Sequence, residues 1–334
     1  MRHRAMLIIL VCILSQTNAQ FRKFSFMQPK MGSPFHIVIY ALDSTEAARA
    51  AASAFLLTDT LNQVFSDYLQ DSELNRLCKT AGLRQSVAVS EPLFDILKKS
   101  FNAWKKSRHT FDISLSPVIR VWRKARLTKT LPLQEQIDSA MTRTGMRWVV
   151  LSKKTRSVYL RKKGMQLDLG GIAKGEVAQR VCDRLKLLGF PYALVDAGGD
   201  LVAGDVPAGI AGWHVGINQP GAEQIMDRQL VLKNKAVATS GDLYQFAEID
   251  GKRYSHLIDP ATGMALTTSR NVTVIAPFGY QAEGLTKACS ILPIRKALRL
   301  AGRMEDVSVQ IAVLENGMPK YFRSRHFEEY FESD

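Results

Sequence analysis

DLGGIAKG, residues 168–175, is the stretch that decides how this 334-residue chain is interpreted. It lies between a predicted strand and a predicted helix, and a second glycine-rich turn, DAGGD, follows it at residues 196–200. Glycines at such a junction let backbone N–H groups approach a phosphate closely, and the N-terminus of the next helix favours negative charge. A carboxylate beside the turn suits a metal, a ribose or an ammonium group. The two turns therefore predict a phosphorylated ligand.

The first 19 residues have the pattern of a secretory signal peptide. A basic start precedes an apolar run at residues 6–14 that is too short to span a bilayer, and residues 17–19 form a small-residue cleavage site. A buried N-terminal helix is the alternative. We expect residues 20–334 to form one large catalytic unit that is periplasmic or otherwise exported. Cys12 lies inside the apolar run and follows Val11, so it makes a poor lipid-anchored cysteine.

Lysine and arginine outnumber aspartate and glutamate, 45 to 31, and the formal net charge is +14. The basic residues are scattered, without a stripe interleaved with aromatics, which argues against a nucleic-acid partner. The charge suits peripheral contact with an anionic membrane or an anionic ligand, or it serves general solubility. Cys78, Cys182 and Cys289 are far apart and odd in number. We predict that they are small core residues, with one disulfide as the alternative.

Hydrophobic periodicity and turn signals predict helices and strands that do not alternate strictly. Helices are expected at residues 45–65 with Ser44 as N-cap, 91–106, 133–142, 174–188, 281–292 and 293–302. Strands are expected at residues 36–40, 148–151, 157–160, 193–195, 213–217, 229–232, 236–239, 254–258, 272–275 and 309–314. Because parallel doubly wound sheets need alternating elements, this order predicts an α+β fold of mixed or antiparallel sheets with packed helices.

Four other segments carry side chains that suit a ligand. Tyr68 could stack on a planar ring or simply begin a surface helix. Asp112 lies in an apolar, strand-like stretch, where it needs a partner: a ligand group or a local turn. The hydroxyls of residues 239–240 could meet phosphate oxygens or cap a turn. His256 precedes Asp259 by three residues in a Pro-Thr-Gly turn, and we predict that it is the general base.

Seven segments in order resemble the ApbE family, the FAD:protein FMN transferases. They are MGS at 31–33, SDY at 66–68 with SEL at 72–74, FDIS at 111–114 with Pro117 and Trp122, DLGGIAKG at 168–175, GGD at 198–200, TSGD at 239–242 and HLIDPATG at 256–263. Each segment alone is a weak signal, but together they cover nearly the whole mature chain. The resemblance implies an exported enzyme with an ApbE-like, T-fold-related architecture.

The resemblance also implies an activity. Such enzymes bind FAD with Mg²⁺ at the pyrophosphate, transfer FMN to a threonine hydroxyl of a flavoprotein subunit of a membrane redox complex, and release AMP. By matched position, His256 would be the base, and the carbonyl of Gly171 would face the metal. The residues that would contact FAD by the same matching are Met31, Tyr68, Thr110, Phe111, Asp112, Asp168, Lys174 and Ile258.

One segment departs from the family pattern. Where the family has a DALATA-like helix start whose aspartate and threonine bind magnesium, this chain reads EGLTKA at residues 283–288. Glu283 remains a hard oxygen ligand with a longer reach. Lys287 is different, because an ammonium at a ligand position repels the ion. Either Lys287 neutralises Glu283 across one helical turn and takes the metal's place, or Thr286 supplies the ligand.

Three functions follow from these residues. The first is an active FAD:protein FMN transferase with an altered metal site. The alternative is an exported FAD-binding protein, a flavin carrier or an FAD pyrophosphatase, that does not transfer FMN because of that alteration. A third, an exported scaffold without flavin, is disfavoured because the glycine turns, Tyr68, Asp168 and His256 are all retained.

Overall fold

The computed structural model describes residues 20–217, 229–241, 246–315 and 318–332. The predicted signal peptide, residues 1–19, lies outside the described residues. Within the described ranges, every helix is too short or too polar to cross a membrane. The three described cysteines are buried and free, which confirms their prediction as core residues.

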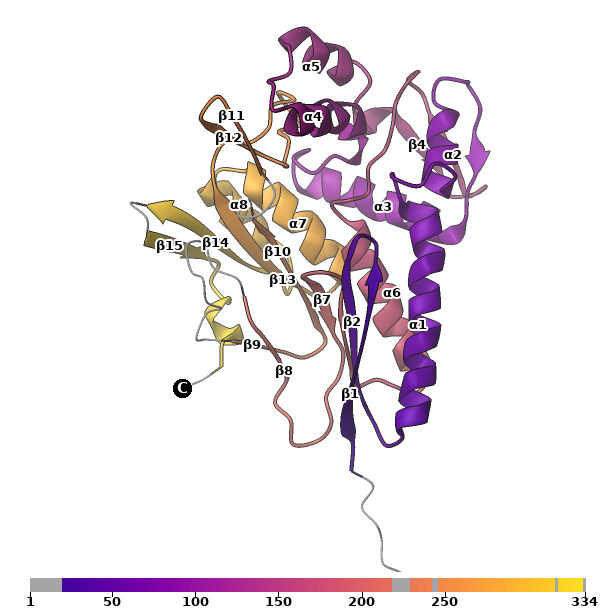
Figure 1. Cartoon of the computed structure of the whole chain (residues 1–334), viewed down its shortest axis with the longest axis vertical. Helices are drawn as coiled ribbons and strands as arrows, with labels where there is room; N and C mark the ends of the chain where they lie inside the picture. Colours follow the sequence, from indigo (N-terminus) through magenta and orange to yellow (C-terminus); the bar gives the residue numbers. More distant parts are fainter. Residues whose placement is uncertain (1–19, 218–228, 242–245, 316–317, 333–334) are drawn as a thin grey trace, which may run out of the picture.

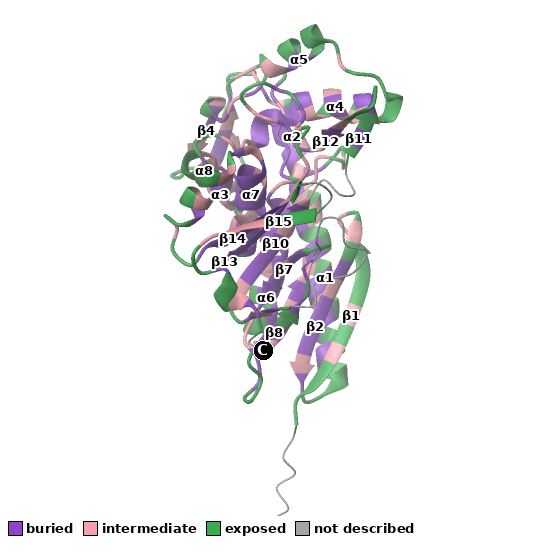
Figure 2. Cartoon of the chain, turned by 90° about the vertical axis from the view of Figure 1, so that its left-hand side faces the viewer, coloured by how far each residue is buried: buried purple, intermediate pink, exposed green. Residues whose placement is uncertain are grey.

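An eight-stranded sheet forms the centre of the molecule, and every neighbouring pair in it is antiparallel. Its strands, in spatial order, are β1 (Arg22–Lys30), β2 (Ser33–Ala41), β6 (Ala193–Asp196), β7 (Asp200–Ala203), β10 (Lys235–Gly241), β13 (Arg270–Ala276), β14 (Ser308–Glu315) and β15 (Met318–Arg323). Figure 2 shows the buried residues along the central strands and the exposed ones on the edge strands β1 and β15. The predicted α+β class is confirmed.

Four helices cover one face of this sheet (Figure 1): α1 (Ser44–Phe65), α6 (Ala173–Leu187), α7 (Gly279–Ile291) and α8 (Ile294–Ala301). Strand residues that point to that face, such as Ile37 and Val274, share one core with helix residues such as Val181. The other face is covered by the hairpin of β8 (Trp213–Val215) and β9 (Leu230–Leu232) with the short helix η3 (Glu328–Tyr330).

A second group of elements lies at one end of the sheet (Figure 1). It comprises α2 (Glu73–Lys79), α3 (Glu91–Lys106), α4 (Ser116–Thr128), α5 (Gln134–Met141), the short helices η1 (Ile113–Leu115) and η2 (Met146–Trp148), a small sheet of β3 (Val87–Ala88), β5 (Ser157–Leu160) and β4 (Val149–Ser152), and the hairpin β11 (Phe246–Ile249) and β12 (Lys252–Ser255). Trp122 on α4 fixes the loop after β12, because its Nε1 donates to the carbonyl of Gly263 at 2.9 Å.

The structure differs from the prediction in four places. Asp43, not Ser44, caps α1, and its Oδ1 accepts from the N–H of Glu46. Residues 161–167 form no strand, so the first glycine turn follows an irregular segment, although α6 begins directly behind it. Residues 109–112 are also irregular, because Asp112 ends the segment as the N-cap of η1. Strand β12 ends at Ser255, which leaves residues 256–258 in a loop.

Candidate functional site

A cavity of about 470 Å³ lies where α4, the two glycine turns, the ends of β10 and β13, and α7 meet. Its volume falls in the range of ~300–1,000 Å³ that is typical of ligand pockets. It collects these predicted site residues: Tyr68, Thr110, Phe111, Asp112, Asp168, Gly171, Lys174, His256, Ile258 and Glu283, together with Lys287. Met31 and Thr286 are not among the residues that line it.

One side of the cavity is built around Asp168, Arg123 and Asp67, which we call the arginine cluster. Oδ1 of Asp168 accepts from the N–H of Gly170 at 2.7 Å, and Oδ2 accepts from Nη2 of Arg123 at 2.9 Å. The other terminal nitrogen of Arg123 donates to Asp67 at 2.7 Å. Burial, with the nearby charge of Asp67, raises the pKa of Asp168, and the guanidinium opposes that rise. One arginine therefore bridges two buried carboxylates.

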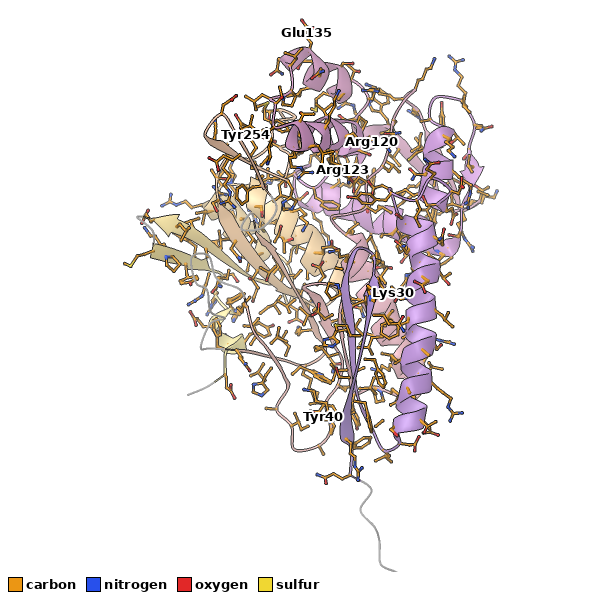
Figure 3. All side chains as sticks on the ribbon, viewed as in Figure 1. Lys30, Tyr40, Arg120, Arg123, Glu135 and Tyr254 are labelled. Atoms are coloured by element: carbon orange, nitrogen blue, oxygen red, sulfur yellow. The ribbon has the colours of Figure 1, made fainter. Side chains whose placement is uncertain are left out.

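Tyr68 lies above the arginine cluster at the mouth of the cavity. The guanidinium carbon of Arg123 is 4.6 Å from the centre of the Tyr68 ring, a cation–π arrangement that fixes one face of the ring. The residue is 76% exposed, so the ring remains accessible to a ligand. Figure 3 places Arg123 below α4, on the side of that helix that faces the large sheet. A planar group could stack on Tyr68, as predicted.

Another side is built around Asp200, Glu283 and Lys287, which we call the lysine cluster. Both carboxylates are buried, and Oε2 of Glu283 accepts from the N–H of Gly175 at 2.8 Å. Burial and the charge of Asp200 raise the pKa of Glu283 to about 8, while Lys287 and Lys174 act against that rise. Burial also raises the pKa of Asp200, and the same two lysines oppose it.

Glycines bring the backbone of these elements close together. A Cβ at Gly175 would lie 2.2 Å from the carbonyl oxygen of Gly279, so α6 and α7 can touch only because both residues lack a side chain. A Cβ at Gly171 would lie 3.2 Å from Cγ of Lys287 and 3.4 Å from the ring of Phe111. The stem of Lys287 and the Phe111 ring therefore both pack on the first glycine turn.

The side chains around Lys287 do not fit the divalent metal that the resemblance implies. A hard cation such as Mg²⁺ needs near-octahedral oxygen ligands. Here Lys287 occupies a ligand position, and one oxygen of Glu283 already accepts a backbone N–H. The hydroxyl of Thr286 donates to the carbonyl of Glu283 at 2.7 Å, but Thr286 is buried and is not among the residues that line the cavity, so it does not supply the missing ligand. The part of the chain that the structure describes contains no cluster of three or more His, Cys, Asp and Glu side chains suited to a metal.

Asp112 and His256 contribute to the rest of the lining. Oδ1 of Asp112 accepts from the N–H of Ser114 at 2.7 Å, so this aspartate caps a local turn, and burial raises its pKa; its contact with FAD stays a prediction. His256 follows β12 and is half-buried in the cavity wall with Ile258. Asp259 shapes the loop, because its carbonyl accepts from the N–H of Gly263 at 2.8 Å. His256 is thus placed where a ligand in the cavity can meet it.

Met31 is not among the residues that line the cavity. It adopts a φ of 52° at the turn between β1 and β2, and its half-buried side chain packs against the main core. Its predicted contact with FAD stays a prediction.

Several lining residues were not predicted. They include Ile119, Arg123 and Arg126 on α4, and Asn271 on β13. The three residues of α4 are spaced by four and three positions and so share one helix face. That spacing could have identified them, had a helix been expected there.

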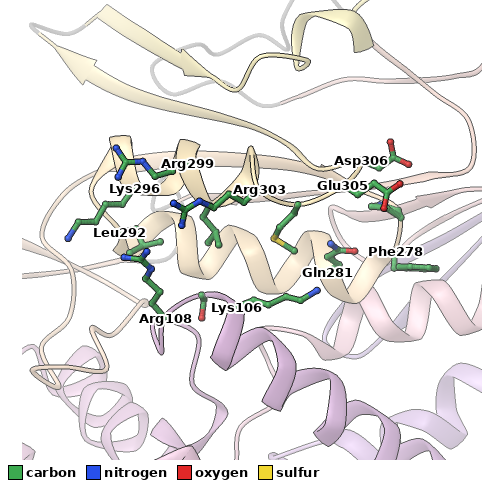
Figure 4. Close-up of a pocket in the computed structure, with 14 residues that line it drawn as sticks. Lys106, Arg108, Phe278, Gln281, Leu292, Lys296, Arg299, Arg303, Glu305 and Asp306 are labelled. Atoms are coloured by element: carbon green, nitrogen blue, oxygen red, sulfur yellow. The ribbon is translucent and has the colours of Figure 1, made fainter.

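A second cavity, about 590 Å³, lies between the end of α3, the start of α7, and α8. It is a basic groove, and Figure 4 shows the side chains that give it this character: Lys106, Arg108, Lys296, Arg299 and Arg303. None of these five cations forms an ion pair with another described residue. No predicted site residue lines this groove, so its larger volume does not make it the better candidate for the phosphorylated ligand.

Comparisons with known proteins agree with this geometry. The family model described as ApbE family matches residues 31–311. An FAD:protein FMN transferase of Treponema pallidum is 32% identical over 313 residues, which are 87% of this chain and 86% of that protein. One of Klebsiella pneumoniae is 29% identical, over 86% of this chain and 88% of that protein. The apo crystal structure of Pseudomonas stutzeri flavinyl transferase ApbE superposes with a TM-score of 0.82 at 27% identity, over 94% and 98% of the two chains. The chain belongs to the ApbE family.

Proposed function

We propose that this protein is an FAD:protein FMN transferase. One observation carries the proposal: a single cavity joins the glycine turn at residues 168–175, the exposed ring of Tyr68 and His256. These are a phosphate-binding backbone, a stacking surface and a proton acceptor, which are the three elements that transfer of a flavin phosphate to a hydroxyl requires. The relatives and solved structures that carry this name cover most of the chain.

The residues that line the cavity suit the groups of FAD. Tyr68 offers a face to a planar ring, while Thr110 and Asp112 can hydrogen-bond the polar edge of a ring or sugar. The N-terminal end of α6 and the ammonium of Lys174 favour the charge of the pyrophosphate. The arginine cluster keeps the first turn in place, because Asp168 accepts from a backbone N–H inside that turn.

The reaction then needs one proton transfer and one exchange at phosphorus. The acceptor threonine oxygen attacks the phosphorus on the flavin side of the pyrophosphate, and a new P–O bond forms. The bond from that phosphorus to the bridging oxygen breaks, and AMP leaves with that oxygen. His256 takes the proton of the threonine hydroxyl, a role that suits a half-buried imidazole in the cavity wall.

The carrier or pyrophosphatase alternative is less well supported. The comparisons name transferases, and His256 lines the cavity, where a protein that only stores flavin would not need a base. An FAD pyrophosphatase would use the same cavity with water in place of threonine. The two outcomes differ in where the FMN goes.

We further propose the cellular setting. The pattern of residues 1–19 supports export and cleavage, which leaves residues 20–334 as one catalytic unit in the periplasm or an equivalent compartment. The acceptor is then a flavoprotein subunit of a membrane redox complex. The net charge of +14 suits peripheral contact with an anionic membrane surface, and no nucleic-acid partner is proposed.

Transfer of FMN tests the proposal directly. The purified protein is incubated with FAD and a flavoprotein subunit of a membrane redox complex, and the intact mass of that subunit is measured together with released AMP. We expect one FMN for each AMP, and no labelling when the acceptor threonine is changed to alanine. His256→Asn is expected to slow transfer by about 10²–10⁴-fold, the usual effect of a general base, while FAD still binds. Free FMN with an unlabelled acceptor would favour the pyrophosphatase instead.

A further inference from the structure

We propose that the ammonium of Lys287 replaces a divalent metal ion at the pyrophosphate, so that this protein binds FAD without added metal. The inference rests on the proposed function, because it names the group that offsets the pyrophosphate charge in that site. It concerns this chain's own departure from the ApbE pattern at residues 283–288.

The position of Lys287 carries the inference. It lies one helical turn after Glu283 on α7, and its side chain lines the cavity. Its stem packs on Gly171, where Cγ is 3.2 Å from the place a Cβ would take. The lysine thus covers the glycine whose carbonyl the resemblance assigns to the metal. It also lies beside the turn that is expected to hold the phosphates.

The hydrogen bonding of Lys287 leaves its charge available. Nζ donates to Oγ of Ser240 at 3.3 Å, at the end of β10. The ammonium has three N–H donors, and this bond uses one of them. Within the described residues it forms no ion pair with Asp200 or Glu283, although its charge acts on both carboxylates. Two donors therefore remain for phosphate oxygens.

The buried carboxylates explain why a cation is needed there at all. Asp200 is 9% exposed and Glu283 is 1% exposed, and the charge of Asp200 raises the pKa of Glu283. An anionic pyrophosphate beside these acidic groups would be repelled unless a positive charge lay between them. In a metal site the ion supplies this charge. Here Lys287 and Lys174 supply it, and both are part of the chain.

The inference predicts that FAD affinity does not depend on metal. Isothermal titration calorimetry of the wild-type protein with FAD, in EDTA and in excess MgCl₂, should give dissociation constants equal within about twofold. Lys287→Met should weaken binding in EDTA by about tenfold or more, since it keeps the stem and removes the charge. Lys287→Arg should keep most of the affinity. Lys296→Met on α8, in the basic groove, is the matched control and should leave the affinity for FAD unchanged.

A second experiment measures the binding of a divalent metal directly. Electron paramagnetic resonance of Mn²⁺ added to the wild-type protein with FAD should show only free Mn²⁺, whereas Lys287→Thr should show a bound signal. FAD binding that is at least about tenfold tighter in MgCl₂, or bound Mn²⁺ in the wild type, would overturn the inference. Circular dichroism of each variant distinguishes lost binding from lost folding.

The outcomes also distinguish the inference from the proposed function. Equal FAD binding in both buffers without any transfer to the acceptor would overturn the transferase proposal and support the role of Lys287. Transfer that requires Mg²⁺ would support the transferase and overturn the role of Lys287. Absence of FAD binding in both buffers would overturn the two together.

Discussion

The arginine cluster and the lysine cluster place the same charges around one cavity but use them differently. Each sets one cation near two buried carboxylates. Arg123 binds both of its partners directly, at 2.7 and 2.9 Å, whereas Lys287 contacts Ser240 and, among the described residues, forms no ion pair with either carboxylate. The guanidinium is a rigid fork that satisfies two carboxylates at once, and the ammonium is a point charge on a flexible stem. The comparison indicates that Arg123 stabilises the fold, whereas Lys287 keeps N–H donors that a ligand can use.

Removal of Arg123 should have the largest effect on stability. Arg123→Met removes the ion-pair partner of the buried carboxylates of Asp67 and Asp168, and the free energy of unfolding should fall by about 3 kcal/mol. Urea denaturation measures this change in the free energy of unfolding. Arg126→Met, three residues further along α4, is the control, because Arg126 forms no ion pair with another described residue; its loss should stay below about 1 kcal/mol. Equal losses in the two variants would contradict the structural role of Arg123.

A methyl group at Gly175 should disturb the lysine cluster, because the N–H of Gly175 donates to Glu283. Gly175→Ala places a Cβ 2.2 Å from the carbonyl oxygen of Gly279, and separation of α6 from α7 should cost about 1–3 kcal/mol. The N–H that Glu283 accepts would move with the helix. Gly284→Ala is the matched control: its Cβ would lie 3.8 Å from Phe111, and it should gain up to about 1 kcal/mol of helix propensity. A neutral Gly175→Ala would argue against a tight helix crossing.

The pH dependence of stability should reveal the charge of Glu283. Its pKa is raised from 4.5 to about 8 in the folded protein, so the folded state holds the proton more tightly than the unfolded chain. Stability from this group is therefore lost as the pH rises from about 5 to about 8.5. Glu283→Gln removes that loss, and its free energy of unfolding should improve relative to wild type as the pH rises. Curves that stay parallel over this range would contradict the raised pKa.

The features that were predicted correctly depend on residues that lie close together in the sequence. The glycine turns, the capped helix at residues 91–106 and the loop that carries His256 are local features, and the structure contains each of them. Helix α4 was missed because it is rich in arginine and lysine, which obscures the apolar stripe of Val118, Trp122 and Ala125. Arg123 was missed with it. Its partners lie 56 and 45 residues away in the sequence, a distance that no local pattern bridges.

The choice between Thr286 and Lys287 also needed the fold. Adjacent residues on a helix point about 100° apart, so only one of the two could face the cavity. Which one does so depends on how α7 is rotated against the sheet. Gly175 and Gly279 fix that contact at the crossing of α6 and α7, and the structure turns Thr286 into the helix layer and Lys287 toward the cavity.

Flavin transfer in the absence of metal tests the central claim most directly. The wild-type protein, FAD and the acceptor flavoprotein are mixed in EDTA and, separately, in excess MgCl₂, and the rate of appearance of flavin fluorescence on the acceptor is followed in gels. The account predicts rates within about threefold of each other, and a Lys287→Met protein that is slow in both buffers. Transfer abolished by EDTA and restored by Mg²⁺ would contradict it.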